Sequence, residues 1–206
     1  MKKGLFITFE GSEGSGKSTQ IEFLRQYLVK RRKKVMLLRE PGGVAISEKI
    51  RAILLDVCNK KMGSECETLL YLAARAQLVY EVIAPALTKG YIILCDRFMD
   101  STVAYQGYGN GVDIEQIYEI GNFATGGVSP DLTFIFDLDA EKGLARIKRQ
   151  KDRIEQRKMD YHKRVRLGYL AIAKKEPQRV KMLDATRTKE NLQQEIQRII
   201  KMVFGM

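Results

Sequence analysis

Residues 11–18 read Gly-Ser-Glu-Gly-Ser-Gly-Lys-Ser, a complete glycine-rich phosphate-binding loop. The loop follows the apolar run 5–9 and precedes Ile21, Leu24 and Leu28, which are spaced as on one face of a helix. When a strand, such a loop and a helix follow one another, successive backbone N–H groups converge on phosphate oxygens. We therefore predict that the chain binds a nucleoside triphosphate, although the loop alone does not identify a reaction.

The polar residues of this loop have predicted tasks of their own. Lys17 can reach the outer phosphates, and the Ser18 hydroxyl suits a magnesium ion. The residues predicted to surround the triphosphate are Gly11, Ser12, Glu13, Gly14, Ser15, Gly16, Lys17, Ser18 and Thr19. A chance match in a surface loop would lack the strand and the helix on either side, so we interpret the motif as functional.

Strand-like and helical segments alternate along the chain. Strands are predicted at 5–9, 35–38, 92–95, 132–136 and 180–183. Helices are predicted at 18–32, 46–57, 65–89, 113–124, 141–151, 158–174 and 188–203. Most strands are continuous apolar runs, which fits a parallel sheet buried on both faces. Helices between parallel strands imply right-handed crossovers, so we expect a three-layer α/β architecture.

Length and composition favour one globular domain over residues 1–206. The chain is long enough for a continuous core, and no linker or internal repeat indicates a second domain. No apolar run reaches membrane-spanning length and no secretory signal is recognised, so we expect a cytoplasmic protein without a membrane partner. Cys58, Cys66, Cys95 and the single His162 predict neither a zinc site nor a disulfide framework.

The net charge of +11 is unevenly distributed. Residues 1–140 contain 17 basic and 17 acidic side chains, whereas residues 141–206 contain 19 basic and 8 acidic ones. Such an excess can indicate contact with nucleic acid or an anionic membrane, or a segment that closes over polyphosphate. It is also compatible with a solvated surface that only keeps the protein soluble.

Charged residues follow two further strands at the point where each strand ends. Arg39 and Glu40 precede Pro-Gly-Gly after the strand 35–38, and Asp96 and Arg97 follow the strand 92–95. In parallel α/β sheets, ligands bind beyond the carboxyl ends of the strands. Asp96 is therefore placed to support a magnesium ion, and Arg97 to clamp a second phosphate. Two arginines and a lysine around one pocket predict two phosphorylated ligands.

Several motifs in this order resemble the thymidylate kinase family. They read Glu-Gly-Ser-Glu-Gly-Ser-Gly-Lys-Ser-Thr-Gln at 10–20, Arg-Glu-Pro-Gly-Gly at 39–43, Asp-Arg-Phe at 96–98 with Ser101 and Ala-Tyr-Gln-Gly at 104–107, Pro-Asp-Leu-Thr at 130–133 and Arg-Val-Arg at 164–166. The similarity extends over almost the whole chain. The combination is much more specific than the phosphate-binding loop, which many nucleotide-hydrolysing enzymes share.

The resemblance implies transfer of the γ-phosphoryl group of ATP to dTMP, with magnesium, in a homodimer. It implies the P-loop nucleoside monophosphate kinase fold, with a five-stranded parallel sheet flanked by helices. It also implies that Arg39 and Arg97 hold the dTMP phosphate and that Tyr71 stacks on thymine. The remaining implied dTMP contacts are Arg75, Ser101 and Gln106 to the base, Tyr105 against a ribose 2′-hydroxyl and Glu13 to the 3′-hydroxyl. Independently of the resemblance, Tyr71 and Arg75 lie one helical turn apart and so face the same way.

A basic lid at about 142–158 would explain the excess of positive charge in the C-terminal third. Phosphoryl transfer is catalysed mainly by alignment and charge stabilisation, so positioned arginines contribute strongly. In one subset of the family an arginine lies inside the phosphate loop, where this chain has Gly14. The basic segment resembles the lid of the bacterial class, with Arg153 and then Arg149 as the implied catalytic arginines beside Lys17, Asp96 and Arg97. Closure of such a lid would also exclude water.

Some positions depart from the family pattern. Val44 replaces a threonine, Phe98 replaces a tyrosine, and Tyr161-His162 replaces two phenylalanines, but no charge that the chemistry needs is lost. Two alternatives stay open, namely a kinase for another nucleoside monophosphate and an ATP-dependent nucleic-acid-binding protein. The second would bind nucleic acid in a strongly salt-dependent way. We do not expect it, because the basic cluster coincides with the implied lid.

Overall fold

The computed structural model describes residues 4–206, and its centre is a sheet of five parallel strands. These are β1 (Leu5–Gly11), β2 (Val35–Arg39), β3 (Ile92–Asp96), β4 (Leu132–Asp137) and β5 (Val180–Asp184). Their spatial order is β2-β3-β1-β4-β5. The register pairs Phe9 with Asp96, Arg39 with Asp96, and Gly11 with Phe136. The carboxyl ends of the first four strands therefore meet at one edge of the sheet.

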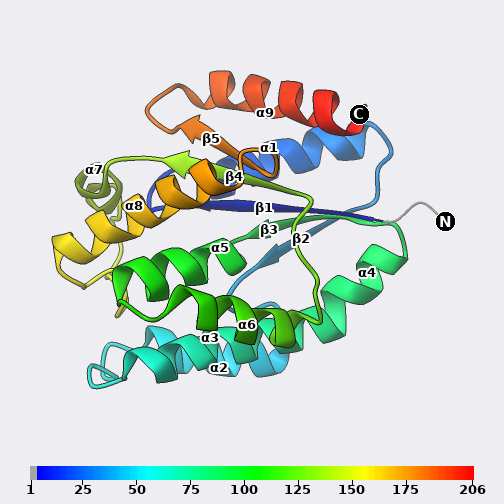
Figure 1. Cartoon of the computed structure of the whole chain (residues 1–206). Coiled ribbons are helices and arrows are strands. Elements are labelled where there is room, and N and C mark those ends of the chain that lie inside the picture. The colour runs from blue at the N-terminus through cyan, green and yellow to red at the C-terminus, as the bar shows by residue number, and fades with distance from the viewer. Residues whose placement is uncertain (1–3) are drawn as a thin grey trace.

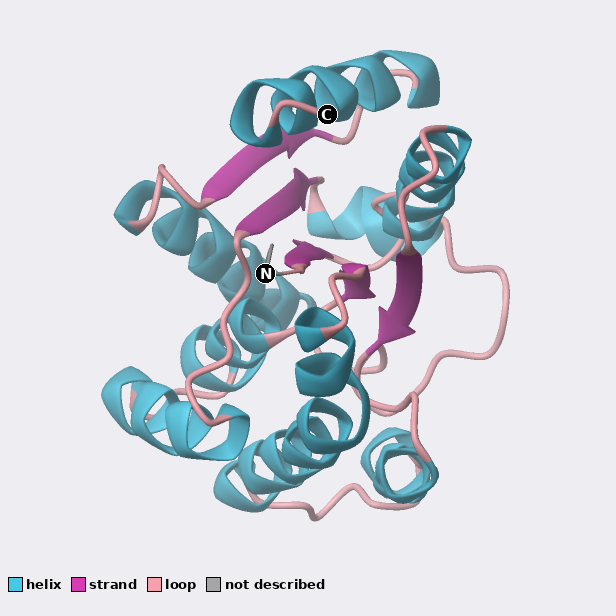
Figure 2. Ribbon diagram, turned by 90° about the vertical axis from the view of Figure 1, so that its right-hand side faces the viewer, coloured by secondary structure: helices cyan, strands magenta, loops and turns pink. Residues whose placement is uncertain are grey.

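Helices cover both faces of the sheet (Figures 1 and 2). One face carries α1 (Lys17–Lys30) and α9 (Lys189–Phe204), which pack against each other and run along the top of Figure 1. The other face carries α3 (Ser64–Leu78), the π-helical segment η1 (Val79–Ile83), α4 (Ala84–Thr88), α5 (Met99–Thr102), the π-helical segment η2 (Val103–Gly109) and α8 (Met159–Lys175). Helices α2 (Ala45–Leu55) and α6 (Ile114–Thr125) both pack on α3, and the short α7 (Ala140–Ala145) packs on α8.

Alternation along β1 shows how the two faces are filled. Ile7 and Phe9 point to one side and pack with α1 and α9, while Phe6 points to the other side and packs with η1 and α4. All three side chains are completely buried. Each such side chain contributes about 1.5–3 kcal/mol of burial free energy, which is why continuous apolar runs form the central strands.

The predicted three-layer fold and its five parallel strands are confirmed. One helix prediction was wrong in its extent, and one helical segment was not predicted. The helix predicted at 141–151 ends at Ala145, because residues 148–151 are all polar and offer no apolar face to pack. No helix was predicted over residues 99–109, where α5 and η2 lie. Among the described helices, none is both long and apolar enough to cross a membrane.

Candidate functional site

A cavity of about 590 Å³ opens at the carboxyl edge of the sheet. It is lined by the phosphate-binding loop and by residues from the ends of β2 and β3, from α3, from η2 and from the segment after α7. The predicted site residues that line it are Glu13, Gly14, Ser15, Gly16, Lys17, Ser18, Thr19, Arg39, Tyr71, Arg75, Asp96, Arg97, Ser101, Tyr105, Gln106 and Arg149. Most residues predicted from separate parts of the chain thus share one cavity.

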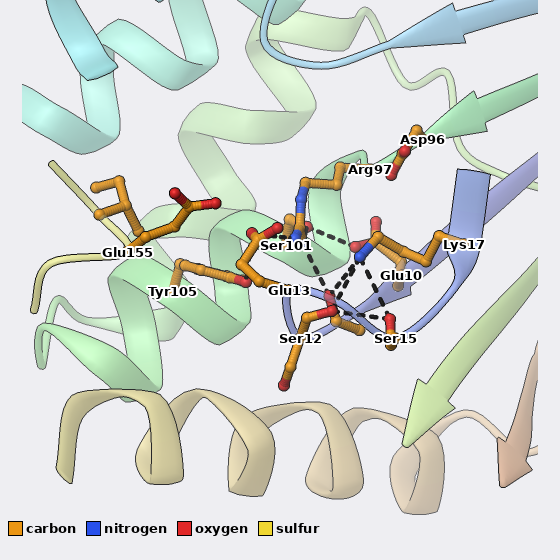
Figure 3. A network of polar contacts seen from close by, with 12 residues as sticks. Glu10, Ser12, Glu13, Ser15, Lys17, Asp96, Arg97, Ser101, Tyr105 and Glu155 are labelled. Atoms are coloured by element: carbon orange, nitrogen blue, oxygen red, sulfur yellow. Dashed lines mark hydrogen bonds and ion pairs between the residues drawn. The ribbon is translucent and has the colours of Figure 1, made fainter. Parts of the chain in front are cut away.

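The phosphate-binding loop takes a conformation that its glycines permit. Gly14 and Gly16 have φ angles of 68° and 90°, in the region where a side chain is strained, and α1 begins directly after Gly16. Lys17 Nζ donates to the carbonyl oxygens of Gly11 and Ser12 at 3.1 and 3.0 Å (Figure 3). Burial lowers the pKa of Lys17, and the neighbouring Arg97 lowers it further. The loop therefore presents the N-terminus of α1 and a buried ammonium group to the cavity.

The structure gives Gly14 a second reason to be glycine. A Cβ atom at this position would lie 2.3 Å from the carbonyl oxygen of Gly143 in α7. A larger residue, including the loop arginine of the other family subset, would collide with the backbone of α7. Arg146, just after α7, donates from NH1 to the Gly14 carbonyl at 3.0 Å and also lines the cavity. Sequence reasoning did not single out Arg146, although it lies in the basic stretch.

Ser18 and Asp96 lie together at the wall of the cavity, as predicted for a magnesium site. Ser18 Oγ donates to Asp96 Oδ2 at 3.2 Å. A hydroxyl and a carboxylate are the oxygen donors that magnesium takes beside substrate phosphates. Within residues 4–206 no cluster of three or more acidic, histidine or cysteine residues offers an all-protein metal cage. The donors present therefore fit a magnesium ion that is held mainly by a nucleotide.

Arg97 is the most constrained residue of the cavity. Its φ angle of 74° is unusual for a residue with a side chain. NH1 donates to the Gly11 carbonyl, to Ser101 Oγ and to Tyr169 OH, each at 3.1 Å, and NH2 donates to Glu13 Oε1 at 2.5 Å. The guanidinium group also lies 5.0 Å from the centre of the Tyr105 ring. These contacts fix the direction of the guanidinium group before any ligand is considered.

Glu13 and Glu10 are carboxylates on the two sides of Arg97 with different properties (Figure 3). Burial raises the pKa of Glu13, but Arg97 and Lys17 outweigh it and bring the pKa to about 2. Glu10 is completely buried and accepts from Phe98 N, Ser101 Oγ and Tyr169 OH. Burial, reinforced by Asp100, raises the pKa of Glu10 to about 7. Glu13 is thus a fixed negative charge, whereas Glu10 supports the groups that orient Arg97.

The rest of the cavity wall combines aromatic and charged side chains. Arg75 is buried and donates from Nε to Glu40 Oε2 at 2.7 Å, while Tyr71, one turn earlier in α3, is half-buried. Gln106 is buried, and Tyr105 OH donates to Glu13 at 3.3 Å. An elongated ligand with an anionic end near Arg97 and a planar end near Tyr71 matches this arrangement.

Arg39 also lines the cavity and is half-exposed. It pairs through NH2 with both carboxylate oxygens of Glu48 at 2.8 and 3.0 Å. Arg51, which sequence reasoning missed, also lines the cavity and donates to the Pro41 carbonyl at 2.8 Å. Its position could have been suspected from its place in α2, three residues after Glu48, where helical spacing puts both on one face.

The two arginines predicted for the lid lie in different environments. Arg149 is 62% exposed, lines the cavity and forms a double ion pair with Glu155 at 2.8 and 2.7 Å. Arg153 is only 7% exposed and is absent from the cavity lining. Its Nε donates to the Leu54 carbonyl at 2.7 Å, and its NH2 lies 2.7 Å from Glu67 Oε2. The geometry therefore favours Arg149 over Arg153 as a lid arginine that meets a ligand.

Comparison with known proteins gives the family that this chain resembles over its length. Residues 9–196 match the sequence model of the family described as Thymidylate kinase. The chain is 47% identical to the thymidylate kinase of Roseiflexus castenholzii over 96% of its length and 93% of the relative's. It is 49% identical to that of Halothermothrix orenii over 97% of both chains. The crystal structure of thymidylate kinase from Ehrlichia chaffeensis superposes with a TM-score of 0.79, at 35% identity, over 96% of this chain and 99% of that one.

Proposed function

The chain belongs to the thymidylate kinase family, and on that premise we propose how its own residues divide the work of the reaction. The enzyme transfers the γ-phosphoryl group of ATP to dTMP, giving dTDP and ADP, and uses ATP with Mg²⁺. One observation carries the assignment of residues. The phosphate-binding loop after β1 and the arginines after β2 and β3 line a single cavity, so donor and acceptor phosphates can meet in line.

We assign the donor side of the cavity to the phosphate-binding loop at 11–19, of which residues 13–19 line the cavity. The N-terminus of α1 and the Lys17 ammonium group oppose the negative charge of the outer phosphates. Ser18 and Asp96 are the oxygen donors that would hold magnesium, which when bound neutralises and aligns the phosphate oxygens. Lys17 and Asp96 thus contribute to catalysis by charge and by position, without forming a covalent bond to the substrate.

The acceptor side begins at Arg97. We assign the dTMP phosphate to Arg97 and Arg39, because both guanidinium groups line the cavity beyond the loop. Glu13 lies next to Arg97 and is held ionised, which suits an acceptor for the 3′-hydroxyl. The assigned base and sugar contacts are Tyr71, Arg75, Ser101, Tyr105 and Gln106, all from α3, α5 or η2. The half-buried Tyr71 ring and the buried side chains of Arg75 and Gln106 can enclose one planar pyrimidine.

The lid arginine that faces the transferring group is Arg149 in this assignment. It is exposed, it lines the cavity, and its ion pair with Glu155 can exchange for phosphate oxygens. Arg146 adds a second positive charge over Gly14. Closure of residues 146–151 over the phosphates would exclude water and so suppress ATP hydrolysis.

A homodimer and a cytoplasmic location are further parts of the proposal. Helices α2, α3 and α6 lie together at the bottom of Figure 1. They carry exposed apolar side chains, namely Ile53 at 47%, Leu69 at 52%, Ile120 at 40% and Phe123 at 87% exposure. Large apolar side chains gathered on neighbouring helices favour a protein interface.

An ADP-release assay tests the acceptor assignment. Purified enzyme is supplied with ATP and Mg²⁺, and with dTMP, dUMP, dCMP, UMP or AMP in turn. We expect kcat/KM to be highest for dTMP, because we assign the pyrimidine to the cavity wall around Tyr71 and Arg75 and place Tyr105 against a ribose 2′-hydroxyl. A higher value for UMP or AMP would contradict the acceptor assignment and favour the alternative of a kinase for another nucleoside monophosphate.

A further inference from the structure

Glu67 is a completely buried carboxylate that none of the assigned roles uses. It lies in the first turn of α3, and four side chains surround its two oxygens. Oε1 accepts from Gln106 Nε2 at 3.0 Å and from Asn110 Nδ2 at 2.9 Å. Oε2 accepts from Arg157 NH2 at 2.6 Å and lies 2.7 Å from Arg153 NH2. A single carboxylate thus joins the acceptor pocket to the end of the lid.

The lid is divided into two parts by its contacts with the rest of the protein. Arg146, Lys148, Arg149 and Gln150 are exposed. Arg153, Ile154 and Glu155 are buried, and the Arg153 backbone N–H donates to the Leu55 carbonyl at 3.2 Å. With its Nε on the Leu54 carbonyl, Arg153 caps the C-terminal end of α2, whose last carbonyls have no partner within the helix. The second half of the lid is therefore fixed to α2 and α3, whereas the first half is exposed and contacts the phosphate-binding loop through Arg146.

A continuous set of hydrogen bonds links this fixed part to Arg149. The Asp152 carboxylate accepts from the backbone N–H groups of Ile154 and Glu155, both at 2.9 Å, and closes a tight turn around Arg153. Glu155 Oε2 accepts from Asp152 N at 2.9 Å. The Glu155 carboxylate in turn holds both NH groups of Arg149. The position of Arg149 therefore depends on the turn that Arg153 anchors.

The same carboxylate also sets the acceptor pocket. Glu67, Tyr71 and Arg75 are spaced by four residues in α3, so they form one stripe along the helix. Gln106 reaches the cavity from η2, and its amide N–H₂ donates to Glu67. This bond fixes which end of the Gln106 amide faces a bound base. The acceptor pocket and the lid thus share one partner, because Gln106 donates to Glu67 and Arg153 forms an ion pair with the same carboxylate.

We propose that Glu67 is a positioning residue, with Arg153 as its partner, which couples occupancy of the acceptor pocket at Gln106 to the placement of Arg149 in the lid. The inference rests on the proposed roles of Gln106 and Arg149. One carboxylate faces two guanidinium groups in a site closed to water, so a shift of Glu67 toward one partner must alter its bonds to the others. Arg153 then acts without touching ATP.

A double-mutant cycle tests this route. Arg153→Met and Arg149→Ala are made singly and together, and kcat is measured with saturating ATP and dTMP. We expect Arg153→Met alone to lower kcat by about 10- to 100-fold, because Arg149 is then misplaced. In the Arg149→Ala background, the same mutation should lower kcat by less than about twofold more. Fully multiplicative effects of the two mutations on kcat would overturn the inference but leave the assignment of Arg149 intact. An unaffected Arg149→Ala variant would overturn both the inference and the assignment of Arg149.

A second variant covers the case in which Arg153→Met does not fold. Arg153→Lys keeps the charge near Glu67 but loses the planar donor to the Leu54 carbonyl, so it should give the same non-additivity with a smaller single effect. A purely structural role would lower the melting temperature and leave the two mutations multiplicative in kcat. Multiplicative effects in this cycle would likewise reject the coupling.

The coupling to the acceptor pocket has its own readout. The chain contains no tryptophan, so Gln150→Trp, at an exposed lid position, gives a single fluorescent reporter. We expect dTMP alone to shift its emission, and Glu67→Gln to abolish that shift while calorimetry still detects dTMP binding. An unchanged shift in the Glu67→Gln background would overturn the inference.

Discussion

Replacement of Arg97 by alanine should stop phosphoryl transfer while ATP still binds. The guanidinium group is the best-oriented cation of the acceptor side, because it is held by Glu13, Ser101, Tyr169 and the Gly11 carbonyl. Lys17 makes separate bonds to the loop carbonyls of Gly11 and Ser12, so the donor side keeps its own cation. The loss should therefore fall on dTMP and on the transition state.

The expected size follows from the number of charged hydrogen bonds. An arginine that holds a phosphate through two bonds contributes about 1.5–3 kcal/mol for each, or about 3–6 kcal/mol in total. That range corresponds to a fall in kcat/KM for dTMP of roughly 10²- to 10⁴-fold. The ATP dissociation constant should change by less than about threefold. Removal of Arg97 also leaves Glu13 without its nearest cation, so the variant should be less stable.

Calorimetric titration with ATP and steady-state kinetics with dTMP separate these effects. Arg179→Ala is the matched control, because Arg179 also forms a largely buried ion pair, with Asp100 at 2.7 Å, and lies outside the cavity lining. The control should lose stability but keep its kcat at a temperature where it is folded. An equal loss of ATP affinity in Arg97→Ala would place Arg97 on the donor phosphates and refute the reasoning.

Three further predictions concern Glu13, Lys17 and Phe123. The pKa of Glu13 in the folded protein, about 2, lies below its ordinary 4.5, so Glu13 stabilises the fold above pH 4.5 by up to about 3 kcal/mol and loses this contribution as the pH falls toward 2. Urea unfolding should show the wild type more stable than Glu13→Gln at pH 7 and equal to it at pH 2, and a constant difference would contradict this. Lys17→Met should lower kcat at least 10²-fold with dTMP binding intact by calorimetry, because the lost charge faces the donor phosphates. Phe123→Glu should shift sedimentation from dimer to monomer, and an unchanged dimer would place the interface elsewhere.

The strand ends could be predicted because two simple rules reinforce each other. Continuous apolar runs identify buried parallel strands, and parallel strands collect their following residues at one edge. The prediction that Lys17, Arg39, Asp96 and Arg97 share a pocket followed from the sequence and agrees with the cavity lining. Residues such as Tyr169 could not be found in this way. Tyr169 lies in the middle of α8 and reaches Arg97 only because that helix packs on η2.

No helix was predicted over 99–109, a segment that contains Gly107 and Gly109. Gly109 is required by packing, since a Cβ atom there would lie 2.5 Å from the Tyr161 ring in α8. Gly107 similarly faces Ile114, with 3.0 Å to the nearest side-chain carbon. Both glycines let neighbouring helices approach η2 closely, so they serve tertiary packing rather than a local turn. A single sequence carries no mark that separates these two uses of glycine.

The two lid arginines show the same limit of prediction from a single sequence, here at the functional site. Arg149 and Arg153 are four residues apart in one basic run, and no local pattern separates an arginine that meets a ligand from one that anchors the chain. What separates them is α2, about a hundred residues earlier, whose terminal carbonyl at Leu54 accepts from Arg153 Nε across a sequence separation of 99. Arg153 contacts the Leu54 carbonyl and Glu67, so in this arrangement it does not reach the phosphate site. Because this anchor is fixed, the exposed residues before it can close and reopen without losing their register, and Arg149 is the arginine among them that already lines the cavity.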